Sequence, residues 1–524
     1  MACCNSDPVL IVGTFCDVSS LSVAEERERR WSHHRVDLQR DWSAFADDPV
    51  LAGLPSLAVL AEANGTRPGR FFLLDPDGVP DLRVNAFFAS PRIRSRAELT
   101  GKKYAIGLGI WLSFLEVLGR RWWEASEEDV GEFKFWRMTD PRNADRVSGG
   151  TVHGNLVAVS SFYQWAERRY GVANPVSLRE VRRGAGGLPA LGYEAGPHVI
   201  RSSDVKWFDP AGYRRWCEVG LRGLGVDGLE DEDWRGRNDQ RDCAFADGLY
   251  GTGLRLQEWG SVLDLELPPD DPGRGFYTCW LAGGCAKGGR GRRYWMPRSV
   301  LASVLAYLEG ARAAAVRRAQ AEGRYERLAG VRVIERVLGD RRLELRSAAS
   351  GGLAVVPADT LDPRARLRLF RQGGRGLEPA AVWLNEDGLP RQPHGWEKTF
   401  ERANERVAKA GLAGLEATPH RLRHSMALRW YAIGRMSYEL RLGHLTTEEM
   451  KDFRAQFGDV WQLVQTLLGH VTVATTMNVY LEPFRSLDVS LLIEHIEGAG
   501  MTALLAELLD QHPRVRTDPL RAAR

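Results

Sequence analysis

The chain has 524 residues and a net charge of +3, with 44% hydrophobic residues, 27% charged residues and seven cysteines. A chain of this length and composition is expected to form two to four domains of a soluble globular protein, and so small a charge does not by itself indicate a nucleic-acid partner. The cysteines lack metal-ligand spacing, which predicts reduced thiols in a cytoplasmic protein without a metal site. No apolar run approaches the ~18 residues of a membrane span, and no basic stretch precedes Leu10-Ile11-Val12, so a signal peptide is not expected.

Residues 1–95 are predicted to be an N-terminal extension of unknown role. An acidic run at 24–46 has a helix-like pattern, and Asp75-Pro76-Asp77-Gly78 predicts a turn after a short apolar stretch. No residue pattern in this region indicates chemistry, and none of it is strongly basic.

Residues 96–176 are predicted to be entirely helical. Thr100 is expected to cap a first helix and Ser148 to open another, which Asn174-Pro175 ends. Both helices carry apolar and aromatic residues at helical spacing, which predicts a packed core. The Gly-, Arg- and Pro-rich residues 177–200 have the composition of a linker.

A further domain is expected from residue 201. An apolar-faced helix at 238–250 leads into Thr252-Gly253-Leu254-Arg255. An arginine at a glycine-flanked turn and helix start presents its guanidinium beside free backbone amides, which suits a phosphate group.

Alternating aromatic residues at 276–280 and 294–295 flank a Gly-rich turn that starts at Lys287, and this pattern predicts a β-hairpin. An amphipathic helix is expected at 301–316. The Arg-rich stretch 317–375 is predicted to be an insertion with strands. The segments expected next are a strand at 381–384, a turn at 385–388 and a helix at 396–410.

Four chemically suited residues follow in one ordered run near the C-terminus: His420, Arg423, His470 and Tyr480. Arginine grips phosphate, histidine moves protons near neutral pH, and tyrosine serves as a covalent nucleophile once its proton is removed. A second Leu-Gly-His triplet ends at His444, but no tyrosine follows it ten residues later, as Tyr480 follows His470.

We therefore assign His470, and not His444, to the predicted site. The stretch of about 435–456 is then predicted to be a second insertion between motif helices. Residues 486–524 are predicted to be a C-terminal helical tail, because leucines and isoleucines recur at helical spacing from 486 to 510.

The ordered motifs Thr252-Gly253-Leu254-Arg255 with Glu258, His420-x-x-Arg423, Leu468-Gly469-His470 and Tyr480 resemble those of the tyrosine recombinase (phage integrase) family. The resemblance implies a multidomain fold, mainly α with a small β-sheet. In this interpretation residues 96–176 are a helical, SAM-like core-binding domain and residues 201–485 an α+β catalytic domain. The N-terminal extension then either covers the next domain or binds accessory DNA.

The resemblance also implies a role for each motif residue. Arg255 and Arg423 would hold the scissile phosphate, with Glu258 orienting Arg255. Tyr480 would attack phosphorus, His420 would act as a base or charge partner, and His470 would donate to the phosphate. Lys287 would protonate the leaving 5′ oxygen. The implied partner is double-stranded DNA, on which a homo-multimer from dimer to tetramer would assemble. The resemblance implies neither a metal nor another cofactor, because a 3′-phosphotyrosyl intermediate conserves the energy of the broken bond.

Three other functions remain open at this point. A type IB topoisomerase uses a similar site and relaxes DNA as a monomer. A DNA-binding regulator with a decayed site would retain the fold without the chemistry. A metal-dependent transposase would need a carboxylate triad, which the sequence does not supply.

Overall fold

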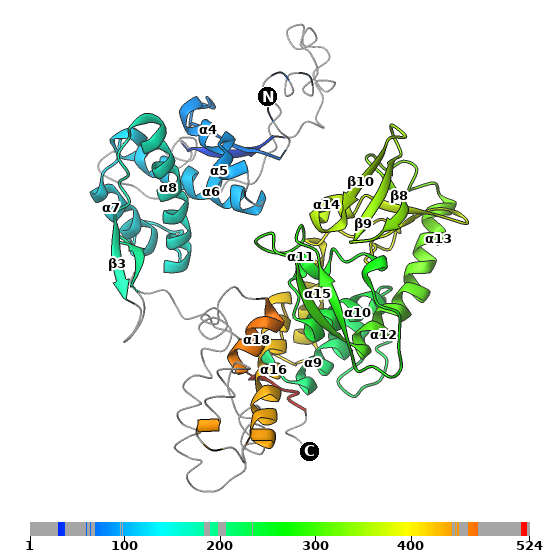
Figure 1. Ribbon diagram of the computed structural model, residues 1–524. Helices are drawn as coiled ribbons and strands as arrows, with labels where there is room; N and C mark the ends of the chain where they lie inside the picture. The colour runs from blue at the N-terminus through cyan, green and yellow to red at the C-terminus, as the bar shows by residue number, and fades with distance from the viewer. Residues whose placement is uncertain are drawn as a thin grey trace. The chain divides into compact units, whose positions relative to one another are not determined.

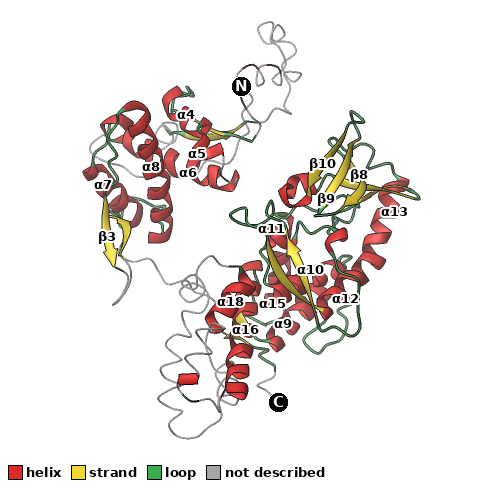
Figure 2. Cartoon of the chain, viewed as in Figure 1, coloured by secondary structure: helices red, strands yellow, loops and turns green. Residues whose placement is uncertain are grey.

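The computed structural model describes residues 30–36, 69–94, 98–182, 189–197, 206–232, 234–442, 460–469 and 515–520, together with a few single positions. The chain divides into two compact units, Met1–Ser202 and Ser203–Arg524, each described by itself (Figure 1). Helices dominate both units and the sheets are small (Figure 2). The fold is therefore mainly α, as the sequence predicted.

The first unit combines two small hairpin-like sheets with a helical body. Its elements in chain order are β1 (Ser32–Arg35), β2 (Phe71–Leu74), α4 (Leu82–Ala89), α5 (Pro91–Arg94), α6 (Glu98–Val117), η2 (Trp122–Glu124), α7 (Glu127–Met138), α8 (Gly149–Tyr170), β3 (Leu178–Arg182) and β4 (Pro189–Tyr193). The strand pairs β1–β2 and β3–β4 are both antiparallel.

The core of this unit is the aromatic stripe expected from helical periodicity. Trp111, Phe162 and Tyr163 are completely or almost completely buried between α6 and α8. Strand β2 and helix α4 contribute to the same core, so the described part of residues 1–95 packs onto the helices that follow it.

Several local predictions in this unit differ from the structure. Thr100 lies inside α6, which already extends back to Glu98, where an ion pair of 2.9 Å joins that residue to Arg35. Ser148 is the N-cap of α8 as expected. That helix ends at Gly171, whose φ of +70° favours glycine, rather than at Asn174.

Two further segments adopt strands where the sequence predicted other structure. Within the run at 24–46 that was expected to be helical, the described residues contain β1, which pairs with β2. The stretch 177–200, predicted to be a linker, contains the β3–β4 hairpin. Strand pairing depends on a distant partner, which explains why local composition did not indicate it.

The second unit has a helical body and a five-stranded sheet. Its elements in chain order are β5 (Trp207–Phe208), α9 (Pro210–Cys217), η3 (Glu218–Arg222), α10 (Asp239–Thr252), α11 (Leu256–Trp259), η4 (Asp264–Glu266), β6 (Phe276–Leu281), β7 (Arg292–Pro297), α12 (Arg298–Tyr307), η5 (Leu308–Arg312), α13 (Ala313–Ala321), β8 (Arg332–Leu338), β9 (Arg342–Ser347), β10 (Leu353–Pro357), η6 (Ala358–Thr360), α14 (Pro363–Arg366), β11 (Leu369–Gly373), β12 (Gly376–Pro379), α15 (Gly395–Lys409), α16 (Pro419–Leu442), α18 (Val460–Leu468) and β13 (Val515–Arg516).

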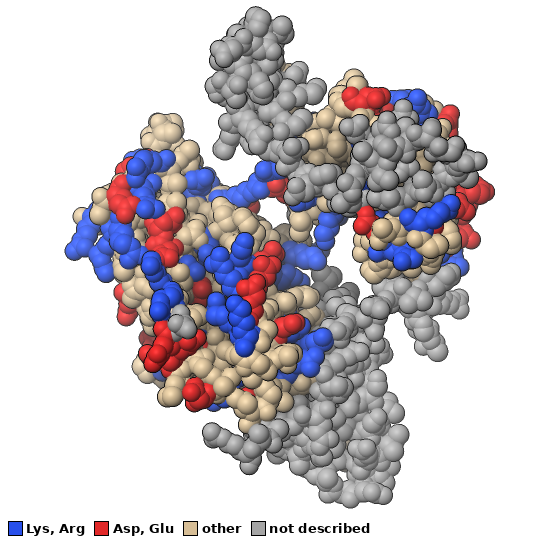
Figure 3. Space-filling model, turned by 180° about the vertical axis from the view of Figure 1, so that it is seen from behind, with Lys and Arg blue, Asp and Glu red and all other residues tan. Residues whose placement is uncertain are grey.

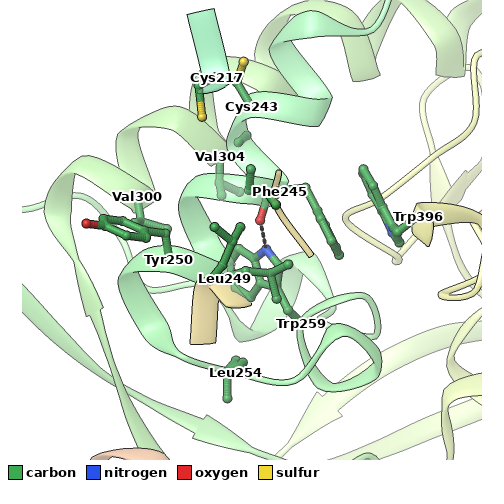
Figure 4. Close-up of a cluster of buried hydrophobic side chains, with 14 of the residues drawn as sticks. Cys217, Cys243, Phe245, Leu249, Tyr250, Leu254, Trp259, Val300, Val304 and Trp396 are labelled. Atoms are coloured by element: carbon green, nitrogen blue, oxygen red, sulfur yellow. Dashed lines mark hydrogen bonds between the residues drawn. The ribbon is translucent and has the colours of Figure 1, made fainter. Parts of the chain in front are cut away.

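Helix α10 is central to the hydrophobic core of this unit (Figure 4). Phe245 stacks on Trp396 with ring centroids 3.5 Å apart, and its carbonyl accepts a hydrogen bond of 3.1 Å from the indole Nε1 of Trp259. The same indole lies so close to Gly248 that a side chain at that position would overlap it. This packing fixes the turn at the end of α10, where Arg255 follows.

The predicted hairpin is present, since β6 and β7 pair antiparallel with Leu281 opposite Arg292. The stretch 317–375, predicted to be an insertion, supplies four strands of a five-stranded sheet in the order β10-β9-β8-β11-β12, and the fifth, β12, follows it directly. The sequence predicted strands here, and β8 and β9 pair antiparallel across a turn in which Asp340 and Arg341 have positive φ.

Residues Arg298–Ala321 form one described helical stretch that is long and apolar enough to cross a membrane by length and composition. The sequence predicted only an amphipathic helix at 301–316 in this region. Val300, Leu301 and Val304 from this stretch are buried in the core of the second unit, so the apolar surface there packs against other helices.

The C-terminal end also differs from the predicted helical tail. Residues 486–510, where the tail helices were expected, lie outside the described residues. Val515 and Arg516 form β13, which pairs in parallel with β5 of the same unit. Arg215 and Asp518 add an ion pair of 3.1 Å.

Candidate active site

Arg255 lies at the junction of α10 and α11. Gly253 ends α10 in the left-handed conformation, with φ of +65°, and Arg255 is the N-cap of α11. Glu258 closes this turn, because its carboxylate accepts hydrogen bonds of 2.9 Å from both the backbone N–H and Nη1 of Arg255. Glu258 is buried and the Arg255 side chain is about one-quarter exposed, so the carboxylate orients a guanidinium that remains accessible.

Arg292, on strand β7, is a second partner of Glu258 that the sequence analysis did not identify. Its Nη1 and Nη2 donate to the two carboxylate oxygens at 3.2 and 2.8 Å. Burial opposes the charged form of Glu258, but the hydrogen bonds and charges of Arg292, followed by Arg255, outweigh it and lower the pKa of Glu258 to about 2. The only signal for this contact in the sequence was the cluster of arginines after Lys287.

Arg423, in the first turns of α16, is almost completely buried at 1% exposure. Its Nη1 donates to the carbonyl of Gly253, and its Nη2 donates to the carbonyl of Leu468 at 2.7 Å. The first carbonyl lies two residues before Arg255 and the second lies two residues before His470. Arg423 therefore joins the motif segments that were recognised separately in the sequence.

His420 lies one turn earlier on α16, with its ring 4.3 Å from that of His424 in an edge-to-face arrangement. The side chain is accessible to solvent, yet partial burial, followed by the charges of Arg423, Arg255 and Lys287, lowers its pKa below 6.5. Three positive groups around one imidazole create a site suited to an anion, and the imidazole itself is neutral at pH 7.

Lys287 is exposed on the turn between β6 and β7. Gly288 and Gly289 continue this turn with φ of +87° and +73°. The backbone N–H of Lys287 lies 3.5 Å from Oε1 of Glu258. The lysine thus shares its surroundings with Arg255 and His420, as the predicted grouping requires.

His470, Tyr480 and the bystander His444 lie outside the described residues, as does most of the predicted insertion at 435–456, although α16 continues to Leu442. Gly469, immediately before His470, is described. Its φ is +64°, and a side chain there would overlap the guanidinium of Arg292. Gly469 therefore lies directly beside the Arg292–Glu258 pair.

Within the described ranges, no group of three or more His, Cys, Asp or Glu side chains is arranged to hold a metal ion. Basic and acidic side chains are interspersed on the face of the protein in Figure 3, in keeping with the small net charge. The positive charge at the site is therefore local: it comes from Arg255, Lys287 and Arg423, and not from a large net charge of the protein.

No protein-family profile matches the chain. Two curated relatives, both named "Integrase/recombinase" and coming from Escherichia coli and Pseudomonas aeruginosa, are each 29% identical over 241 residues. The match covers 44% of this chain and 52% of each relative, so the chain spans about half the length of the curated relatives it matches.

Solved structures with a similar chain path include the site-specific recombinase XerH in a post-cleavage complex, with 13% identity and a TM-score of 0.43 over 77% of this chain and 82% of the other. Another is the Tn1549 transposon integrase with circular intermediate DNA, with 13% identity and a TM-score of 0.41 over 78% and 98%. The chain thus resembles the tyrosine recombinase family, through curated relatives named as recombinases and through the ordered motifs around Arg255, His420 and Arg423.

Proposed function

We propose that the protein is a site-specific DNA recombinase that cleaves and rejoins strands through a 3′-phosphotyrosyl intermediate. The observation that carries the proposal is the pair of hydrogen bonds from Arg423 to the carbonyls of Gly253 and Leu468. These bonds hold the segment before Arg255 and the segment before His470 against one helix, so that separate motifs converge on one anion-binding site.

In the proposed reaction, Arg255 neutralises charge on the scissile phosphate, with Arg423 as its partner. Fixed cationic donors of this kind stabilise the extra charge of the transition state, each by as much as ~3 kcal/mol. The Tyr480 oxygen forms a bond to phosphorus and gives its proton to His420, whose lowered pKa keeps the imidazole in the neutral, proton-accepting form. The bond to the 5′ oxygen breaks, and that oxygen takes a proton from Lys287.

His470 donates a hydrogen bond to the phosphate in this scheme. The covalent phosphotyrosine conserves the energy of the broken bond, so rejoining needs neither a nucleotide cofactor nor a metal. Reversal with a different 5′ hydroxyl exchanges strands, which is the step that distinguishes recombination from simple nicking.

The helical residues 96–176 are proposed as the SAM-like core-binding domain, which contacts duplex phosphates through outward-facing arginines and lysines. The working unit is proposed to be a homo-multimer, from dimer to tetramer, assembled on double-stranded DNA. The curated relatives' names support recombination as the activity of the whole protein.

A suicide DNA substrate tests the proposal, because a nick just beyond the scissile phosphate lets the short fragment with the freed 5′ hydroxyl diffuse away and traps the covalent adduct. We expect the wild-type chain to form an adduct that maps to Tyr480 by peptide mass spectrometry. Tyr480→Phe removes one oxygen and should abolish the adduct while DNA binding persists. Tyr170→Phe, at a half-exposed tyrosine of the first unit, is the matched control and should form the adduct normally.

An adduct that persists in Tyr480→Phe, or that maps to another residue, would contradict the assignment. The complete absence of an adduct with every DNA tested, together with tight DNA binding, would instead favour a regulator with a decayed site.

A further inference from the structure

The five-stranded sheet contacts the hairpin that carries Lys287, mainly through the short segment around Asp359. The backbone carbonyl of Asp359, in η6 next to β10, accepts a hydrogen bond of 2.7 Å from the N–H of Gly284. A Cβ at Gly284 would lie 2.5 Å from the carbonyl oxygen of Leu361. The sheet and the first half of the Lys287 turn are therefore in backbone contact, at a distance that only glycine allows.

The carboxylate of Asp359 reaches the hairpin by a second route. Its Oδ1 accepts a hydrogen bond of 2.9 Å from the indole Nε1 of Trp280. Its Oδ2 pairs at 3.1 Å with Nη2 of Arg341, whose guanidinium lies over the Trp280 ring at 4.3 Å. The indole is thus held by a hydrogen bond at its edge and a cation on its face.

Trp280 transmits this support to the second half of the turn. A Cβ at Gly291 would lie 2.8 Å from the Trp280 ring, so the indole packs directly on the backbone at Gly291. Asp359 consequently braces both ends of the turn, through Gly284 on one side and through Trp280 on the other. Lys287 lies between these two points, on an exposed turn whose glycines have little conformational preference of their own.

We propose that the inserted sheet is a brace for the general acid, and that Asp359 is a positioning residue that holds the Lys287 turn in its reactive place. The inference rests on the proposed function, in which Lys287 delivers a proton to the leaving 5′ oxygen. A lysine on a four-carbon stem delivers that proton efficiently only when its backbone is fixed, because a shift of about 1 Å costs on the order of 100-fold in rate.

The test compares two DNA substrates in single-turnover cleavage. In one, the leaving atom is the ordinary 5′ oxygen. In the other it is sulfur, which departs as a thiolate and does not need a proton. Asp359→Ala is expected to slow the oxygen substrate by about 10- to 100-fold and to leave the sulfur substrate near the wild-type rate. Lys287→Ala should show the same selectivity in a stronger form.

Two further variants make the result decisive. Asp359→Asn keeps an acceptor for Trp280 but loses the charge that faces Arg341, so its loss of rate should be selective but smaller. This variant replaces Asp359→Ala in the test if the alanine variant does not fold. Glu344→Gln removes a carboxylate that pairs with Arg336 elsewhere on the same sheet, and should cleave both substrates at the wild-type rate.

The inference is wrong if Lys287→Ala slows only the oxygen substrate but the Asp359 variants slow both substrates equally, or slow neither. If Lys287→Ala itself lost activity equally on both substrates, the proposed role of Lys287 would be wrong and the brace would lose its purpose. These two failures give different patterns and can be told apart.

Discussion

Glu258 is the residue whose removal has the effect most directly calculable from the structure. On folding, the pKa of its carboxyl falls from 4.5 to about 2, and each pKa unit corresponds to about 1.4 kcal/mol. The ionised carboxylate therefore stabilises the folded second unit by about 3 kcal/mol at neutral pH. Because the folded pKa is the lower one, this contribution is fully present above pH 4.5 and is lost as the pH falls toward 2.

Glu258→Gln preserves the shape of the side chain but leaves Arg255 and Arg292 without their shared anion. We expect the free energy of unfolding of this unit to fall by about 3 kcal/mol at pH 7, which corresponds to hydrogen exchange about 100-fold faster at the most protected amides of α10. Cleavage of DNA should also slow, since Arg255 loses the carboxylate that orients it.

Hydrogen–deuterium exchange read by mass spectrometry measures this change within the second unit alone. Glu344→Gln is the matched control, because Glu344 also binds an arginine through both oxygens, at 2.7 and 3.1 Å, but at the surface, where solvent screens the pair. The reasoning is refuted if α10 exchanges no faster in Glu258→Gln than in Glu344→Gln. It is also refuted if the difference between the two variants grows as the pH falls below 4.5.

Three other predictions concern catalysis and assembly. His470→Ala should abolish cleavage while His444→Ala leaves it intact, and single-turnover assays showing the reverse would transfer the assignment to His444. The rate should fall as the pH is lowered below 6.5, because His420 takes up a proton, and this acid limb should disappear in His420→Gln. DNA binding should weaken steeply with added salt, and the protein bound to DNA with paired sites should sediment as a multimer. Efficient relaxation of plasmid DNA by a single protomer would instead favour the topoisomerase.

The parts of the site predicted from the sequence are those encoded by local signals. Gly253 followed by Arg255 and Glu258 is a short-range pattern, and the helix end and cap form as that pattern requires. The hairpin around Lys287 was predictable for the same reason, since alternation of side chains and a glycine-rich turn lie within about 20 residues.

Arg292 and Asp359 were not predictable in this way. Arg292 meets Glu258 across 34 positions of sequence, and the contact depends on the register that places Arg292 opposite Leu281. Asp359 meets Trp280 across 79 positions. Neither residue differs in type from its many charged neighbours, so only the folded chain distinguishes a partly buried, two-sided contact from a solvated charge.

The C-terminal end illustrates the same limit. The sequence 486–510 predicted apolar helices, but nothing local indicated that Val515 would pair with Trp207, more than 300 residues earlier. Val515 is buried, and the Asp209 N–H donates to the carbonyl of Arg516 at 3.1 Å. The end of the chain is therefore part of the second unit's own structure.

For the proposed multimer, this attachment constrains any docking of the predicted helices at 486–510 on a neighbouring protomer. The stretch 470–514, which carries Tyr480, is held at one end by the bond from Arg423 to Leu468 and at the other by β13. Exchange that carried the whole tail to a neighbour would break the β13 pairing and expose Val515. Exchange of an internal part of 470–514, with both ends retained, would leave the β13 pairing and the Arg423 contact intact. Assembly through the internal segment is therefore the less costly route, and a truncation designed to test it must leave residues 515–520 in place.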